Sequence, residues 1–144
     1  MTVATTPVLA RRRLTLPTVA ASVPAARRAA RVLLADWLAE EERDLADAAL
    51  LVLSELVTNT VRHAAPRSPF SDVALTLTRE ALVIAVHDRH PVIPAPRSVA
   101  HADGCGGRGL AIVAALADEA GGELRVVADA DALGKTSTVR LPRP

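Results

Sequence analysis

The middle of the chain reads ELVTNTVRH from Glu55 to His63. Glu55 and Asn59 are four residues apart, so they share one face of a helix. Apolar residues recur over 45–63 closely enough to cover most of a helix circumference. The pattern therefore predicts a largely buried helix over 45–63, which Pro66 ends. A carboxylate and an amide on such a helix need either partners or a function.

The spacing of Glu55 and Asn59 has two interpretations. In the functional one, Asn59 supplies a neutral oxygen ligand to a hydrated Mg²⁺, and Glu55 orients or deprotonates a nucleophile. In the structural one, both side chains hydrogen-bond to neighbouring backbone and carry no chemistry. The pair alone does not decide between them.

The rest of the chain predicts one compact domain over 13–144, after a flexible N-terminal arm over 1–12. Helical spacing and apolar alternation predict two further helices and five strands. The predicted strands are 13–16, 72–78, 81–87, 124–128 and 135–141, and the further helices are 22–42 and 107–120. This order predicts an α+β two-layer sandwich, with the helices on one face of a mixed, mainly antiparallel sheet.

A glycine-rich turn precedes the last predicted helix. Gly107, Arg108, Gly109 and Leu110 stand where free backbone N–H groups and the helix dipole favour a phosphate. A flexible hinge explains the same glycines. Asp88 ends a predicted strand at the start of a long Pro- and Gly-containing loop, and its carboxylate can accept a hydrogen bond from an exocyclic amine or simply cap the loop.

Composition narrows the classes of partner. The formal net charge is +1, and the aromatic residues are one Trp and one Phe, so we expect neither nucleic acid nor a membrane surface as partner. Cys105 is the only cysteine, and no apolar run is long enough to cross a membrane, so we expect a reducing, cytoplasmic location. Basic residues are almost all Arg, and Lys135 is the single lysine.

Taken together, four motifs resemble the histidine-kinase-like (GHKL) ATPase superfamily, in its stand-alone anti-sigma-factor serine/threonine kinase branch of actinobacterial type. They are the segments 55–64, 86–97, 107–113 and 134–136. The resemblance covers nearly the whole chain and implies the Bergerat ATP-binding fold. The family's second motif commonly reads Asp-x-Gly-x-Gly, whereas Asp88 is followed here by Arg89-His90-Pro91.

The resemblance also implies roles for individual residues. Asn59 would bind Mg²⁺, Glu55 would be the catalytic base, and Arg62 would lie near the phosphates of ATP. Asp88 would recognise adenine, and Thr136 would support hydrogen bonds on the adenine side. The remaining expected nucleotide contacts come from the glycine turn: Gly107, Arg108, Gly109 and Leu110.

By resemblance, the chain is expected to be a homodimeric regulator that binds a sigma factor and phosphorylates an antagonist protein. One alternative is a non-catalytic module that uses nucleotide only to order a protein-binding surface; another is a detached sensor-kinase catalytic domain. A zinc site formed by His87, His90, His101 and Cys105 is a further alternative, because imidazole and thiolate both bind zinc.

Overall fold

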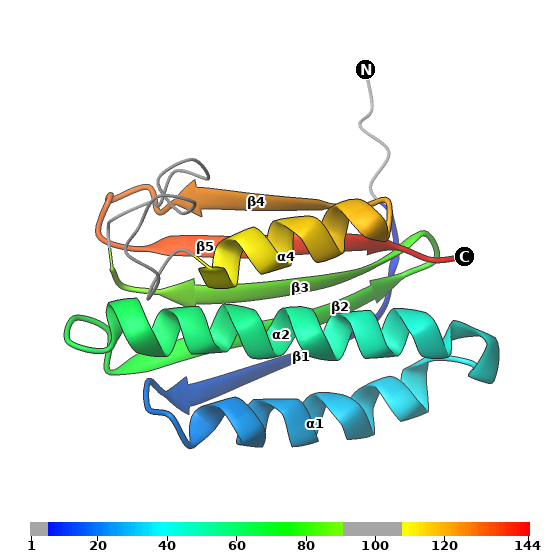
Figure 1. Ribbon diagram of the computed structural model, residues 1–144, viewed down its shortest axis with the longest axis horizontal. Coiled ribbons are helices and arrows are strands. Elements are labelled where there is room, and N and C mark those ends of the chain that lie inside the picture. Colours follow the sequence, from blue (N-terminus) through cyan, green and yellow to red (C-terminus); the bar gives the residue numbers. More distant parts are fainter. Residues whose placement is uncertain (1–5, 91–107) are drawn as a thin grey trace.

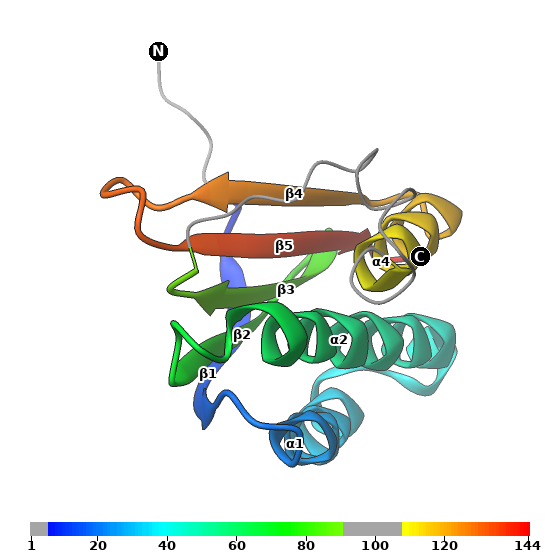
Figure 2. The same cartoon turned by 60° about the vertical axis from the view of Figure 1, so that its left-hand side comes forward.

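A computed structural model describes residues 6–90 and 108–144 as two layers, three helices on one face of a five-stranded sheet (Figures 1 and 2). This confirms the predicted α+β sandwich. The helices are α1 (Ser22–Trp37), α2 (Arg43–Ala64) and α4 (Arg108–Glu119), with a 3₁₀ turn, η1 (Glu40–Glu42), between α1 and α2. The strands are β1 (Val8–Pro17), β2 (Phe70–Thr78), β3 (Ala81–Asp88), β4 (Glu123–Ala128) and β5 (Lys135–Pro142).

The sheet has the order β1-β2-β3-β5-β4, and each of its four pairings is antiparallel. Alternate residues of the inner strands face the helices, as a period of two requires. Leu75, Ile84 and Val139 stand in one cross-strand row, and each is at most 2% exposed. Their helical counterparts are Val52 and Leu53 of α2. The core therefore lies between α2 and the middle of the sheet.

Two predicted boundaries are wrong. β1 begins at Val8, so residues 8–12 pair with β2 and are not a loose arm. Exposed arginines at 11–13 interrupt the apolar alternation there, and backbone pairing holds the strand instead. The first helix ends at Trp37, not near residue 42, because Leu38 is extended, with φ −107° and ψ 146°.

The C-terminus is fixed to the junction between α1 and α2. Arg143 donates hydrogen bonds from Nε to Glu42 Oε2 (2.7 Å) and from Nη2 to Glu42 Oε1 (2.9 Å). Its Nη1 also donates to the Thr78 carbonyl at 3.0 Å. These contacts join η1, the β2–β3 turn and the end of β5 at one end of the molecule.

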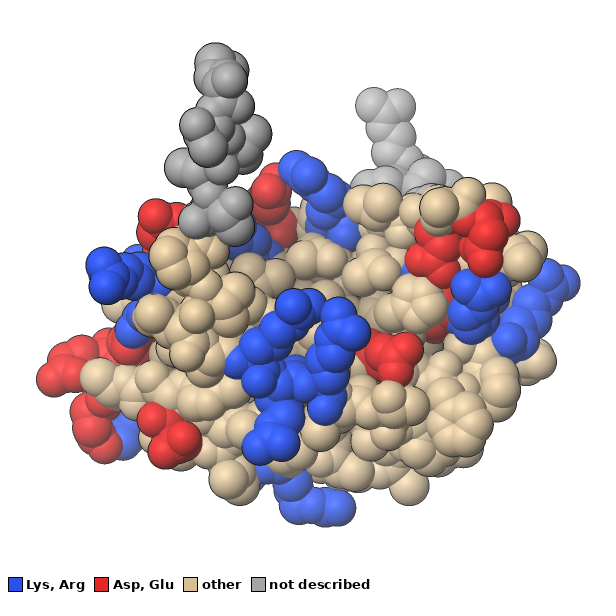
Figure 3. Space-filling view, turned by 180° about the vertical axis from the view of Figure 1, so that it is seen from behind, with Lys and Arg blue, Asp and Glu red and all other residues tan. Residues whose placement is uncertain are grey.

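The other face of the sheet carries no helix from the described part of the chain, and Figure 3 looks onto it. Basic side chains gather near its middle. The strand register places Arg11, Arg13, Arg125 and Arg140 on this face, around small residues such as Ala74. All four arginines are exposed, and the buried core lies on the helical side of the sheet.

No helix within residues 6–90 and 108–144 is long and apolar enough to span a membrane.

Candidate functional site

The C-terminal half of α2 carries the predicted Glu55–Asn59 pair. Both side chains are half-buried, and neither forms a hydrogen bond or an ion pair with another residue of the described chain. The described residues therefore do not form the hydrogen bonds to neighbouring backbone that the structural interpretation requires. Arg62 is seven residues after Glu55, on the same helix face, and its side chain is exposed. The three residues form a polar stripe along the C-terminal half of α2.

Asp88 ends β3 beside this half of α2. Its carboxylate is 3% exposed and is surrounded by donors. Oδ1 accepts hydrogen bonds from Lys135 Nζ at 3.0 Å and from the His90 backbone N–H at 2.9 Å. Oδ2 accepts a longer one, of 3.4 Å, from the hydroxyl of Thr60. Because Thr60 follows Asn59 on α2, Asp88 and the polar stripe belong to the same end of the molecule.

Backbone packing holds Asp88 from two sides. The buried hydroxyl of Ser68 accepts a hydrogen bond from the Arg89 N–H at 2.9 Å and donates one to the Phe70 carbonyl at 2.8 Å. Opposite it, Gly134 lies so close that a Cβ there would be 2.6 Å from the Asp88 carbonyl oxygen. The end of β3 is therefore closely packed on both sides.

The surroundings of His90 are basic. Burial lowers the pKa of His90, and the positive charges of Lys135 and Arg67 lower that pKa further. Asp88 acts in the opposite direction and His63 in the same direction as the cations. Cationic groups on this side of Asp88 suit an anionic ligand.

Thr136 lies on the other face of the sheet from Asp88. It pairs with His87, and Lys135 pairs with Asp88. Since neighbouring residues of a strand point to opposite faces, Thr136 and His87 face the open side of the sheet. There His87 Nε2 lies 2.8 Å from Asp129 Oδ2. The structure therefore does not bring the side chain of Thr136 to the Asp88 carboxylate.

The glycine turn is only partly described. Gly107 lies outside the described residues, and α4 begins at Arg108. Leu110 is 5% exposed and belongs to the core, so its side chain packs against apolar neighbours. In Figure 1 the N-terminal end of α4 lies over the C-terminal half of α2, at the end of the sheet where β3 finishes. The helix N-terminus and the polar stripe thus share one end of the molecule.

The zinc alternative has two of its four residues, His101 and Cys105, outside the described ranges. Within residues 6–90 and 108–144, no group of three or more His, Cys, Asp or Glu side chains is placed to hold a metal ion.

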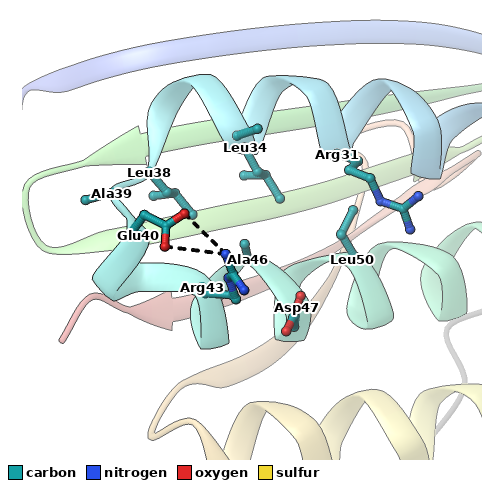
Figure 4. Close-up of a pocket in the computed structure, with 10 residues that line it drawn as sticks. Arg31, Leu34, Leu38, Ala39, Glu40, Arg43, Ala46, Asp47 and Leu50 are labelled. Carbon is teal, nitrogen blue, oxygen red and sulfur yellow. Dashed lines mark hydrogen bonds and ion pairs between the residues drawn. The ribbon is translucent and has the colours of Figure 1, made fainter.

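A separate cavity of about 620 Å³ lies between α1 and α2, as Figure 4 shows. Leu34, Leu38 and Leu50 line its floor, and Arg43 at its edge forms hydrogen bonds of 3.2 and 3.4 Å with Glu40. It lies toward the N-terminal half of α2 and contains none of the predicted site residues.

Sequence reasoning missed Lys135 and Thr60, the two side chains that contact Asp88. Lys135 stands in a Gly-Lys-Thr segment, but such a segment before a strand does not by itself predict a phosphate loop. One feature of the sequence points to Lys135. It is the only lysine in a chain with sixteen arginines, which indicates a specific role. Thr60 gave no signal beyond its place next to Asn59.

The chain is similar to proteins of one known family. The family model for the histidine kinase-like ATPase domain matches residues 16–136. The RsbU and RsbW domains of Rv1364c from Mycobacterium tuberculosis have a similar fold, with a TM-score of 0.66 and 24% identity over 94% of this chain. The chain spans 33% of that solved chain.

A histidine kinase domain from Erythrobacter litoralis EL346 aligns over 67% of this chain and 44% of its own, with 26% identity and a TM-score of 0.46. Among curated proteins, none is significantly similar to the chain.

Proposed function

Because the chain belongs to the histidine kinase-like ATPase family, we propose that it is an ATP-binding regulator that phosphorylates a serine or threonine of an antagonist protein and captures a sigma factor. The observation that carries this proposal is the half-buried pair of Glu55 and Asn59, which bonds to no residue within 6–90 and 108–144. Half-buried oxygen-bearing side chains that bond to no described residue are available to coordinate a ligand.

The residues present fit Mg²⁺ and ATP. The amide oxygen of Asn59 and the carboxylate of Glu55 are hard oxygen donors of the kind that Mg²⁺ accepts. Asn59 would hold the ion, which when bound neutralises charge on the transferring phosphate. Asp88 would accept a hydrogen bond from the base through Oδ2, the oxygen with the longer contact.

In the proposed transfer, the hydroxyl oxygen of the antagonist attacks the γ-phosphorus of ATP, and the bond from that phosphorus to the β–γ bridging oxygen breaks. The carboxylate of Glu55 takes the hydroxyl proton, and ADP leaves with the bond's electrons. Arg62 and the N-terminal end of α4 would stabilise the phosphates. The polar stripe on α2 places Glu55 and Arg62 on one face for these two tasks.

Calorimetric titration of ATP with Mg²⁺ tests the nucleotide site. Wild type should bind, and Asn59→Ala should lose most of the affinity. Ser54→Ala is the matched control, because Ser54 is a neighbouring half-buried polar residue of α2 whose hydroxyl donates to the Leu50 carbonyl instead of facing a ligand. No binding to well-folded wild type would sink the proposal.

Phosphate transfer is tested separately, with labelled ATP and purified small antagonist proteins from the host. Glu55→Gln should keep ATP binding and lose phosphoserine or phosphothreonine formation. If partner capture survives in Glu55→Gln and wild type transfers no phosphate, the chain is the non-catalytic binding module. Phosphohistidine on a partner would instead indicate a sensor-kinase catalytic domain.

The expected homodimer is also a proposal. Gel filtration at several protein concentrations distinguishes a dimer from a monomer.

A further inference from the structure

The single lysine of the chain is buried against the carboxylate that the proposed function assigns to the base of ATP. Lys135 is 4% exposed, and its Nζ lies 3.0 Å from Asp88 Oδ1. Both residues face the helical side of the sheet, where they are paired in register across β3 and β5. Burying an ion pair costs desolvation free energy. We therefore expect a function for this pair, because it lies beside the proposed ligand site.

The described residues do not use all the hydrogen-bond donors of Lys135 or all the acceptor positions of Asp88. The ammonium group of Lys135 has three N–H donors. The structure uses one on Asp88 Oδ1 and one on the His90 carbonyl oxygen, at 3.2 Å. Oδ1 of Asp88 also accepts the His90 N–H, whereas Oδ2 has only the 3.4 Å contact with Thr60. Within the described residues, one donor on Lys135 and acceptor capacity on Oδ2 of the adjoining Asp88 carboxylate therefore remain.

We propose that Lys135 and Asp88 read the base edge of the nucleotide together, with Asp88 Oδ2 accepting from the exocyclic amine of adenine and Lys135 Nζ donating to ring nitrogen N1. The inference rests on the proposed ATP site and adds Lys135 to it as a specificity-determining residue. Adenine presents a donor and an acceptor next to each other on this edge, which matches the acceptor and donor that the pair has left.

The same arrangement rejects guanine docked in the same orientation. Guanine carries a carbonyl oxygen where adenine has its amine, and an N–H where adenine has a bare N1. Asp88 would then face an acceptor, and Lys135 would face a donor. A buried site that pairs its polar groups with one base and leaves them unpaired with another discriminates strongly.

The test measures dissociation constants for ATP, for 1-deaza-ATP, which lacks N1, and for GTP, by fluorescence titration. Wild type should bind 1-deaza-ATP and GTP at least about tenfold more weakly than ATP, the discrimination expected for one lost hydrogen bond to a charged group. Lys135→Met should bind ATP and 1-deaza-ATP equally, and Lys135→Arg should restore part of the preference. A purely structural Lys135 would lower all affinities and leave the ratio unchanged.

Arg89→Met is the matched control. Arg89 follows Asp88, but its guanidinium binds Asp129 and Asp131 at 3.2 and 3.3 Å, away from the Asp88 carboxylate. This variant should keep the wild-type ratio.

Two results with 1-deaza-ATP would overturn the inference while the proposed function stands: equal affinities of wild type for ATP and 1-deaza-ATP, or an unchanged ratio in folded Lys135→Met. Should Lys135→Met fail to fold, Lys135→Arg decides instead: the ratio should change, and a ratio equal to that of wild type overturns the inference. Tighter binding of GTP than ATP also overturns it. Absence of any nucleotide binding to wild type would remove the proposed function itself.

Discussion

Arg143 and Glu42 are 101 residues apart in the chain and are joined by two hydrogen bonds, of 2.7 and 2.9 Å. Glu42 is 8% exposed, and the Ala39 N–H also donates to its carboxylate, at 3.2 Å. The hydrogen bond with Arg143 lowers the pKa of Glu42, and burial acts against it. The last residues of the chain therefore fix the turn between the two long helices.

Arg143→Ala should destabilise the protein by about 2–3 kcal/mol, because it leaves a largely buried carboxylate without its charged partner. The free energy of unfolding in urea measures this loss. Arg43→Ala is the control, because Arg43 pairs with Glu40 at a site where both side chains are at least 70% exposed. Such exposed pairs contribute less than about 1 kcal/mol, and an equal loss in both variants would contradict the prediction.

His90 should make the stability depend on pH below neutrality. Its pKa is lowered from 6.5 by burial and by the charges of Lys135, Arg67 and His63, with Asp88 opposing them. The unfolded chain therefore takes up this proton at a higher pH than the folded chain does. The contribution of His90 to the free energy of unfolding is complete above pH 6.5. It is lost as the pH drops from there to the lowered pKa.

Urea unfolding between pH 7.5 and pH 5 measures this effect. His90→Gln should remove part of the decline in stability within this interval. A variant with the same slope as wild type would exclude His90 as its source.

Gly134→Ala should destabilise the protein and weaken ATP binding together. A Cβ at this position would stand 2.5 Å from Asp129 Oδ2 and 2.6 Å from the Asp88 carbonyl oxygen, so backbone has to move beside the base site. Forced repacking of this kind costs about 1–3 kcal/mol. Thermal unfolding and ATP titration measure the two effects.

Gly122→Ala separates the two effects of that substitution. Its Cβ would meet the Arg140 carbonyl oxygen at 1.9 Å, a severe clash at the far end of β5 from Lys135. It should destabilise the protein while the folded fraction binds ATP normally. Weakened binding in both variants would mean that lost stability alone is responsible.

Thr136→Val should leave ATP affinity unchanged, and Asp88→Asn should reduce it. Thr136 faces the open side of the sheet with His87, and it forms no hydrogen bond through its side chain with the described residues. Calorimetric titration of both variants makes the comparison. Loss of binding in Thr136→Val would return this residue to the nucleotide site.

The sequence pattern predicts the elements that bury one regular apolar face. The predicted helix 45–63 corresponds to α2 at Arg43–Ala64, and the predicted strands 72–78 and 81–87 correspond to β2 and β3. The predicted strand 13–16 is shorter than β1, because the exposed arginines of β1 interrupt the apolar alternation and pairing with β2 holds the strand. Periodicity reports burial, so a strand held mainly by its backbone escapes it.

The candidate site divides in the same way. Glu55 and Asn59 could be grouped in advance, because four residues on a helix fix their common face. Lys135 and Asp88 could not, because strand pairing brings together residues 47 positions apart. The face on which Thr136 lies depends on strand register, because a shift of one residue in a strand moves a side chain to the opposite face of the sheet.

The only lysine of the chain can carry a spectroscopic label beside the proposed base site. Amine-directed labelling has a single side-chain target in this sequence, and that amine lies 3.0 Å from Asp88. Reductive methylation with a carbon-13 reagent would place one NMR probe at Lys135, beside the proposed base site. The chemical shift of this probe with and without nucleotide reports whether the ligand contacts the amine, free of the overlapping signals that surface lysines give in most proteins.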